Sequence, residues 1–240
     1  MKRFVVLLIT VAFFDASTGE PSPEIIPVEG GLSGDGITTR YWDCCKPSCG
    51  WTDLVNNTRF KTPVHTCAID GIEIIDPQQQ SGCADVGAAY TCSNQQPFVV
   101  NSTLAYGFSA VSFTGGEDYH MCCSCMLLNF QGQLSGKKML VQITNTGSPL
   151  AVNQFDIELP GGGVGIYPHG CMKQWNASET GWGDTFGGVH SDAECSELPA
   201  VLQPGCHFRF QFMEGVSNPP VTFQQVQCPR ELVAITGCEY

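Results

Sequence analysis

Fourteen cysteines in a chain of 240 residues constrain the fold more than any other feature of the sequence. An even number of cysteines at this density is typical of a disulfide framework in an oxidising compartment. The rival interpretation is structural zinc, which needs four thiolate or imidazole ligands at regular spacings. The dense groups at residues 44–49 and 122–125 do not provide two spaced C-x-x-C pairs. We therefore expect up to seven disulfides, whose connectivity the sequence leaves open, and no bound metal.

The N-terminal segment has the order of a secretory leader. Residues 1–3 form a basic start, residues 4–14 are apolar apart from Thr10, and residues 15–19 are mostly small and polar. The apolar run of about 11 residues is shorter than the ~20 that a membrane-spanning helix needs. We expect a signal peptide over 1–19 and a secreted, extracellular protein without membrane association. An interfacial helical anchor is the alternative.

The remainder of the chain is expected to form a single domain. Proline and glycine punctuate residues 20–35, which predicts a short exposed lead-in. No linker and no internal repeat interrupts residues 36–240, so we expect one domain there. N-glycosylation acceptors begin at Asn56, Asn101 and Asn176, and these predict surface loops if the source glycosylates.

The charge of the chain excludes two classes of partner. The formal net charge is -12 and the pI is about 4.6. Nucleic acids and anionic membranes attract basic surfaces, so we expect neither as a partner. The charge suits a neutral polymer better than an anionic one.

Short apolar runs between frequent glycines and prolines predict an all-β fold. Apolar residues alternate over 207–212, the period of a half-buried strand, whereas 138–143 is continuously apolar, as in a strand buried on both sides. Short helices are expected only over 193–202 and 230–236. The expected strands are 98–101, 108–113, 126–130, 138–144, 154–159 and 207–212.

The most informative segment is 38–51, TTRYWDCCKPSCGW. It places the carboxylate of Asp43 among aromatic rings and three cysteines. Bridges would hold this carboxylate rigidly, as a catalytic group requires. Trp51 is suited to stack on a sugar face and Tyr41 to hydrogen-bond a hydroxyl. The alternative is that Tyr41 and Trp42 belong to the core and that Asp43 pairs with a nearby cation, Arg40 or Lys46.

A second segment, 153–165, reads NQFDIELPGGGVG. As a strand it would place Asp156 and Glu158 on one face and the apolar residues on the other. The glycine run would let backbone approach a ligand closely. Taken alone, the segment also fits an ordinary surface edge.

Other enzyme classes find little support. The sequence lacks a Gly-x-Ser-x-Gly elbow, and its five histidines are scattered without ligand spacing. His120, beside the 122–125 cysteines, is expected to be a loop residue. We expect no metal and no organic cofactor.

Segment 38–51 closely resembles the signature of glycoside hydrolase family 45 endoglucanases. The resemblance extends over nearly all of the chain after the leader, through the sequences SGC (81–83), AYTC (89–92), GKK (136–138), FD (155–156), PGGGVG (160–165) and QVQCP (225–229). It implies a six-stranded double-psi β-barrel with long disulfide-bonded loops and a few short helices, as one catalytic domain over 36–240. It also implies an open groove, seven disulfides, and endo-acting hydrolysis of β-1,4 bonds in cellulose with inversion.

The resemblance also implies site roles. Asp43 matches the general base and Asp156 the general acid, while Thr39, Tyr41 and Trp51 match positions that contact substrate. Inversion needs a neutral acid and an ionised base ~6.5–9.5 Å apart. The acid is therefore expected to have the raised pKa and the base to stay ionised. The implied partner is a β-glucan, cellulose or xyloglucan, and an open groove is compatible with a monomer.

Two positions depart from the family pattern. Pro149 stands where the family usually carries a third Asp, on a loop that closes over the groove, and Gln154 stands where a His is common. Proline supplies neither charge nor donor. Glu158 or Asp118 are candidates to compensate.

These departures leave alternatives open. One is a hydrolase of the same family whose specificity has moved to xyloglucan. Another is a non-hydrolytic polysaccharide-binding relative, as in expansins, which share the barrel but generally lack an equivalent of Asp43. A purely structural or inhibitor-binding secreted protein is the third.

Overall fold

The computed structural model describes residues 23–55, 60–116, 118–147 and 150–240. The expected signal peptide, the acceptor at Asn56 and Pro149 lie outside the described residues. Within the described ranges, no helix is both long and apolar enough to cross a membrane.

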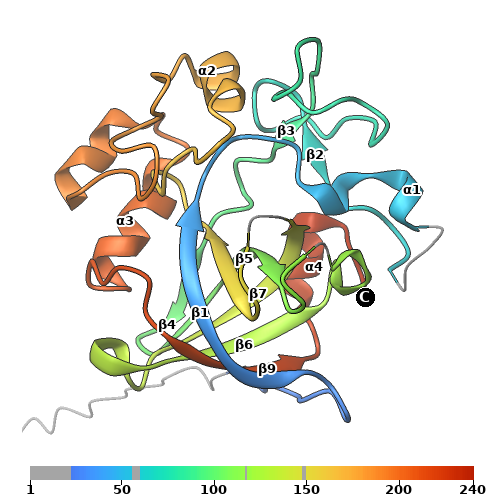
Figure 1. Ribbon diagram of the computed structural model, residues 1–240, viewed down its shortest axis with the longest axis vertical. Helices are drawn as coiled ribbons and strands as arrows, with labels where there is room; N and C mark the ends of the chain where they lie inside the picture. The colour runs from blue at the N-terminus through green and yellow to red at the C-terminus, as the bar shows by residue number, and fades with distance from the viewer. Residues whose placement is uncertain (1–22, 56–59, 117, 148–149) are drawn as a thin grey trace, which may run out of the picture.

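Six strands close into a barrel that mixes parallel and antiparallel pairs (Figure 1). Their order around the barrel is β5-β7-β6-β9-β1-β8, and β8 returns to pair with β5. This is the closed six-stranded barrel that the sequence predicts. A further strand, β4, pairs with the first half of β5 outside the ring. The strands are β1 (Ser33–Tyr41), β4 (Phe98–Asn101), β5 (Leu104–Ser112), β6 (Cys125–Phe130), β7 (Lys138–Thr146), β8 (Gln154–Glu158) and β9 (Val221–Val226).

The register of β8 places the expected acids. Parallel pairing of β1 with β8 sets Thr39 opposite Asp156 and Tyr41 opposite Glu158. On its other side β8 runs antiparallel to β5, with Ala110 opposite Asp156. Because side chains alternate along a strand, Asp156 and Glu158 share one face of β8, as expected from the sequence.

The other face of β8 builds the barrel core. Phe155 and Ile157 are fully buried there, together with the apolar side chains of β6 and β7. The ring of Phe155 lies 5.1 Å from that of Phe223 and 5.7 Å from that of Phe113, centroid to centroid. Strand β7 is buried along most of its length, as its continuously apolar sequence predicts.

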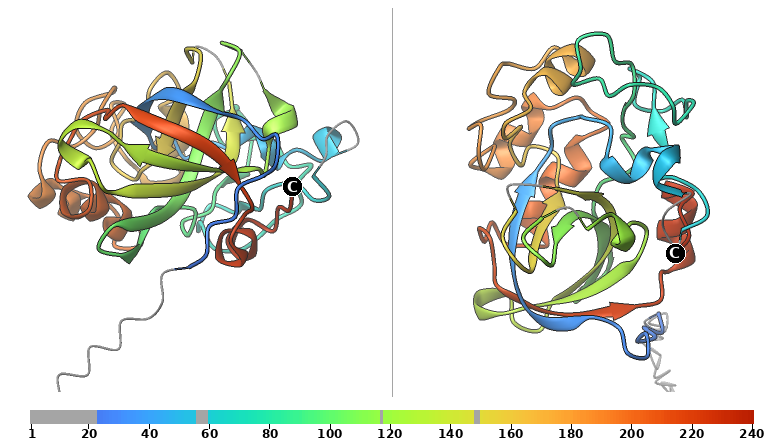
Figure 2. Two further views of the ribbon diagram at one scale, coloured as in Figure 1. Left: turned by 90° about the horizontal axis from the view of Figure 1, so that it is seen from below. Right: turned by 45° about the vertical axis from the view of Figure 1, so that its right-hand side comes forward.

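Long connections with short helices cover the upper end of the barrel in Figure 1. They enclose a second apolar cluster that includes Trp42, Tyr90 and Trp182. A short ladder, β2 (Thr66–Cys67) with β3 (Tyr90–Thr91), lies with these connections. The α-helices are α1 (Thr52–Val55), α2 (His169–Trp175), α3 (Gln203–Gln211) and α4 (Arg230–Thr236), and the 3-10 helices are Ser48–Gly50, Tyr119–Met121, Gly132–Leu134 and Asp192–Glu197. The right-hand view in Figure 2 shows α4 outside the barrel, next to the C-terminus.

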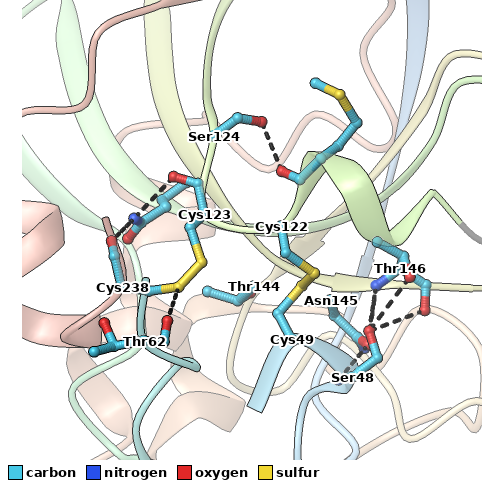
Figure 3. Close-up of a disulfide and its surroundings, with 12 residues drawn as sticks. Ser48, Cys49, Thr62, Cys122, Cys123, Ser124, Thr144, Asn145, Thr146 and Cys238 are labelled. Atoms are coloured by element: carbon cyan, nitrogen blue, oxygen red, sulfur yellow. Dashed lines mark hydrogen bonds between the residues drawn. A yellow bond between two sulfur atoms is a disulfide. The ribbon is translucent and has the colours of Figure 1, made fainter. Parts of the chain in front are cut away.

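All fourteen cysteines are paired in seven disulfides, which confirms the framework expected from their number. Two of these bridges lie side by side in Figure 3, Cys49–Cys122 and Cys123–Cys238. They tie the signature segment and the C-terminus to the start of β6. The remaining bridges are Cys44–Cys171, Cys45–Cys83, Cys67–Cys92, Cys125–Cys228 and Cys195–Cys206.

The strand predicted over 207–212 is wrong, because this segment belongs to helix α3. Its alternating Phe residues also satisfy a helical pattern. Phe208 and Phe212 are four residues apart, so they share one helix face and stack with ring centroids 5.1 Å apart. Proline in the first turn and the bridge from Cys206 to Cys195 further favour the helix.

Other boundaries differ from the sequence-based ones. Strand β1 begins at Ser33, inside the expected lead-in, and pairs with β9, which was not predicted. The helix expected over 193–202 is a 3-10 helix that ends at Glu197. Helix α4 has the predicted bounds. Of the described glycosylation acceptors, Asn176 is exposed and Asn101 is partly buried.

The disulfides close loops of very different length, which predicts different contributions to stability. Cys44–Cys171 spans 127 residues and Cys195–Cys206 spans 11. In the chain-entropy account, removing the first pair costs about 5 kcal/mol and removing the second about 3 kcal/mol. We expect this order when each pair is replaced by alanines and unfolding is measured in guanidinium. Equal costs would show that loop entropy does not govern these bridges.

Candidate active site

An open cleft of about 820 Å³ lies beside the paired strands β1 and β8. The five side chains singled out from the sequence, Thr39, Tyr41, Asp43, Trp51 and Asp156, all line it. Segments far apart in the chain complete the walls, namely 81–84, 145–147, 162–167, 185–187 and 217–218. A smaller hollow of about 460 Å³ beside β2 and β3 has one carboxylate, Asp76, in its lining. The paired carboxylates therefore distinguish the larger cleft as the candidate site.

Asp43 follows β1 and is held by bridges on the next two residues, Cys44 and Cys45. Its Oδ1 accepts the N–H of Cys45 at 2.9 Å, and its side chain is largely buried. Helix α2 packs on its backbone so closely that a Cβ on Gly170 would lie 2.4 Å from the Asp43 carbonyl oxygen. The framework thus fixes this carboxylate in the cleft.

One alternative from the sequence was that Asp43 pairs with Arg40 or Lys46. In the structure both cations have other hydrogen-bond partners. The guanidinium of Arg40 donates to Gly187, Ser217 and Asn218. The ammonium of Lys46 donates to the carbonyls of Pro77 and Gln79. Asp43 is thus not neutralised by either side chain.

Asp156 lies in the middle of β8. Its Oδ1 accepts the hydroxyl of Thr39 at 2.6 Å, and its main-chain carbonyl accepts the hydroxyl of Ser109 at 3.0 Å. The positive charge of Arg40 also acts on this carboxylate.

A buried polar network supports the cleft behind Tyr41. The amide of Asn145 accepts the N–H of Ser48 and donates to the Tyr41 hydroxyl at 3.0 Å. Figure 3 shows Ser48 beside Asn145. The Tyr41 hydroxyl in turn donates to Glu158 Oε1 at 3.2 Å, and Thr144 donates to the same oxygen. Glu158 is 1% exposed and does not line the cleft, so this acid supports the site through its hydrogen bonds.

The ring of Trp51 is fixed by a buried cation. The ammonium of Lys46 lies 3.3 Å from the ring centroid, which is a cation–π contact. Burial lowers the pKa of Lys46 to about 8.

Two aromatic side chains that the sequence analysis did not single out also line the cleft. Tyr167 is 52% exposed and Phe186 is 74% exposed. The turn that carries Phe186 is fixed by two hydrogen bonds, because both Arg40 and Arg209 donate to the carbonyl of Gly187. Such exposed rings offer flat apolar faces on which sugar rings can stack. An aromatic residue in a glycine-rich segment, GWGDTFGG, was the available sequence signal.

The carboxyl groups around the cleft share raised pKa values. Burial raises the pKa of Asp43 to about 7, and the negative charge of Asp156 adds to this. Burial also raises the pKa of Asp156 to about 6, against the hydrogen bond from Thr39 and the charge of Arg40. Burial raises the pKa of Glu158 to about 8. Burial therefore raises the pKa values of both members of the candidate pair well above the usual range of an aspartate.

The glycine run after β8 packs closely against the chain's own backbone. A Cβ on Gly162 would lie 2.7 Å from the Leu159 oxygen, and one on Gly163 would lie 2.6 Å from the Thr185 oxygen. The carbonyl of Gly163 accepts the N–H of Trp42 at 2.8 Å. The glycines therefore let this turn pack against the end of β1.

Two other acidic positions have structural roles. The carboxylate of Asp118 accepts the N–H groups of Phe113 and Thr114 and does not line the cleft. Asp192 contacts His207 next to Cys195, but the Cys195 sulfur is in a disulfide and cannot act as a thiolate ligand.

The sequence model of glycosyl hydrolase family 45 matches residues 35–239. This chain belongs to glycosyl hydrolase family 45. It is 59% identical over 242 residues to an endoglucanase of Phaedon cochleariae, with 99% of each chain covered. It is 44% identical to an endoglucanase of Cryptopygus antarcticus, with 99% of this chain and 97% of that one covered. The crystal structure of a cellulase from the Antarctic springtail Cryptopygus antarcticus is similar, with a TM-score of 0.81 at 45% identity over 87% of this chain and 98% of that one. The protein is therefore a glycoside hydrolase of the endoglucanase class.

The raised pKa of Glu158 in this family 45 enzyme predicts a pH-dependent stability. A carboxyl whose folded pKa is above its unfolded value stabilises the fold fully below about pH 4, and this contribution is lost as the pH rises toward the folded pKa, about 8 here. Glu158→Gln mimics the protonated acid. We expect its Tm to equal that of the wild type at pH 4 and to exceed it by on the order of 10 °C at pH 8. Glu197→Gln, at an exposed site, is the control and should show no such difference.

Proposed function

We propose that this enzyme cleaves internal β-1,4-glucosidic bonds of cellulose or a related β-glucan with inversion, using Asp156 as general acid and Asp43 as general base. The observation that carries the proposal is that these two carboxyls, remote in sequence, line one open cleft. They are close enough for the charge of Asp156 to raise the pKa of Asp43.

The chemistry follows from the two positions. Neutral Asp156 donates its proton to the glycosidic oxygen while the bond from that oxygen to the anomeric carbon breaks. Ionised Asp43 removes a proton from a water molecule, whose oxygen attacks the anomeric carbon from the opposite face. The reaction leaves Asp156 ionised and Asp43 protonated, and exchange with solvent restores both. An open cleft lined by Trp51, Tyr167 and Phe186 suits an internal segment of a long neutral polymer.

The raised pKa values of both carboxyls bear on the proposed mechanism. Because burial brings both pKa values close to neutral, the pair can hold one proton at near-neutral pH, which is what an inverting pair needs. The assigned reaction requires this proton on Asp156 when sugar is bound. The hydrogen bond from Thr39 and the charge of Arg40 lower the pKa of Asp156, but burial outweighs them.

The natural polymer is a separate part of the proposal. Gly147 and Leu150 line the cleft on either side of the positions that include Pro149. A change of residue in this loop therefore bears on what the cleft accepts, and xyloglucan is the alternative substrate that we propose to test. A polysaccharide-binding protein without turnover is the second alternative, since the auxiliary Asp is missing.

We further propose a secreted monomer. The support for secretion is the leader pattern together with seven disulfides, which persist in oxidising compartments. The monomer is proposed because an open groove for a polymer needs no residue from a partner subunit.

Product release from three polymers tests the proposed activity. We expect soluble oligosaccharides from carboxymethylcellulose, amorphous cellulose or xyloglucan. Asp43→Ala and Asp156→Ala should each lower the rate by a factor of about 10³ or more, because each removes one proton transfer. Absence of products from the folded, oxidised protein on all three polymers would favour the binding protein.

A substrate with a good leaving group separates the two roles. An aryl cello-oligosaccharide with a nitrophenolate leaving group needs little acid assistance. We therefore expect Asp156→Ala to retain most of the wild-type rate on this substrate and Asp43→Ala to lose it. The reverse pattern would exchange the roles of the two carboxyls.

A further inference from the structure

A chain of three hydrogen bonds connects the loop before β8 to Asp156. The N–H of Ala151 donates to Gln154 Oε1 at 2.8 Å. Gln154 Nε2 lies 2.9 Å from Thr39 Oγ1, and Thr39 Oγ1 lies 2.6 Å from Asp156 Oδ1. Three of these residues, Thr39, Gln154 and Asp156, line the cleft.

The chemistry of the groups gives this chain one direction. A backbone N–H can only donate, so the Gln154 atom that faces Ala151 must be the amide oxygen. The other end of the amide is then NH₂, which also can only donate. Thr39 must accept at its oxygen, and its single hydroxyl proton is left for Asp156 Oδ1. The direction follows from Ala151 alone and does not depend on how the amide was assigned.

We propose that Gln154 is a positioning residue that directs the hydroxyl proton of Thr39 onto Oδ1 of Asp156 and thereby leaves Oδ2 as the oxygen that carries the transferable proton. This inference rests on the proposed role of Asp156 as the general acid. An acid with two equivalent oxygens would hold its proton on the unproductive one for part of the time. Because Oδ1 accepts the hydroxyl of Thr39, the acidic proton of Asp156 is held on Oδ2.

An amide suits this task at any working pH. Gln154 has no titrating proton, so the direction of the chain is the same in acid and in neutral solution. A histidine at the same position, where the resemblance places one, would titrate near pH 6.5 and change its donors as it did so. The chain also connects Asp156 to the backbone of the loop at Ala151, so the loop and the acid are mechanically coupled.

Other groups also act on Asp156 and must be separated from Gln154. The titratable and charged groups that face it from the described strands and loops are Arg40 and Tyr41 of β1, Asp43 after β1, and Glu158 of β8. Strand β5 contributes Ser109 and Ala110, which do not titrate.

The test follows the carboxyl carbon of Asp156 by ¹³C NMR in aspartate-labelled protein, with Asp156→Asn to assign the signal. Gln154→Glu preserves the shape and the bond from Ala151, but its second oxygen accepts from Thr39 and draws the hydroxyl proton away from Asp156. Thr39→Val removes the hydroxyl. We expect Thr39→Val to raise the pKa of Asp156 by about one unit, because the carboxylate loses its hydrogen bond. We expect Gln154→Glu to raise it by more, because the new negative charge adds to the loss of that bond.

Two controls isolate the relay. Val152→Glu adds the same charge two residues away, on a side chain that is 59% exposed and outside the chain of bonds. Thr39→Ser retains the hydroxyl. We expect both to shift the pKa of Asp156 by less than about 0.3 units. A shift in Gln154→Glu no larger than that in Val152→Glu would overturn the proposal.

The titration needs no turnover, so it separates the relay from the proposed function. The alkaline limb of the kcat profile on polymer should move with the NMR pKa in Gln154→Glu. If the NMR pKa moves and the kinetic limb does not, the relay stands and the role of Asp156 as acid fails.

Discussion

Parallel pairing of β1 with β8 sets the position of the two acids on β8, Asp156 in the cleft and Glu158 behind it. It places Thr39 beside Asp156 and Tyr41 beside Glu158, and each of these cross-strand pairs makes a hydrogen bond that orients one acid. The register itself is fixed from the other face of β8, because Phe155 and Ile157 fill the barrel core. A slip by one residue would bury Asp156 in that core and expose the two apolar side chains. The packing of the barrel interior therefore determines the geometry of the site.

The two candidate catalytic carboxyls are held by different means. Asp156 stands on a central strand, whereas Asp43 stands on a loop that has no regular structure of its own. Bridges at Cys44 and Cys45 and the close contact of α2 replace the support that a strand would give. The chain has few charges, 14% of its residues, and the described part has four ion pairs, two of which involve histidine. Apolar burial and covalent bridges thus hold the long connections in place.

Much of the fold was predictable where local sequence and tertiary environment agree. Strands β4, β6 and β7 are apolar runs between turn residues, and they form where expected. Strand β1 was missed because its residues, SGDGITTRY, have little local preference for a strand and depend on β8 and β9 as partners. Helix α3 was misread because four-residue spacing and alternation both fit its phenylalanines.

The site was predictable in part. The resemblance of segment 38–51 supplied Thr39, Tyr41, Asp43 and Trp51, and the structure brings them together with Asp156. The structural roles of Glu158, Asn145 and Lys46 were not visible in the sequence. Each depends on a contact with a residue distant in the chain, and no local pattern encodes such a contact. The elevated pKa of Asp43 has the same origin, since it comes from burial under loops that only the folded chain assembles.

The strand order of the barrel has a consequence for how the molecule folds. Strand β1, near the start of the chain, lies between β8 and β9, near its end, so the ring cannot close until almost the whole chain has been made. Contacts between residues so distant in sequence form slowly, because the entropy of closing a long loop is lost before the contacts are gained. The pair of Asp43 and Asp156 cannot come together in any species that lacks the β1–β8 contact. An unfinished or wrongly bridged chain would therefore have no catalytic activity. The cleft forms only when folding is complete.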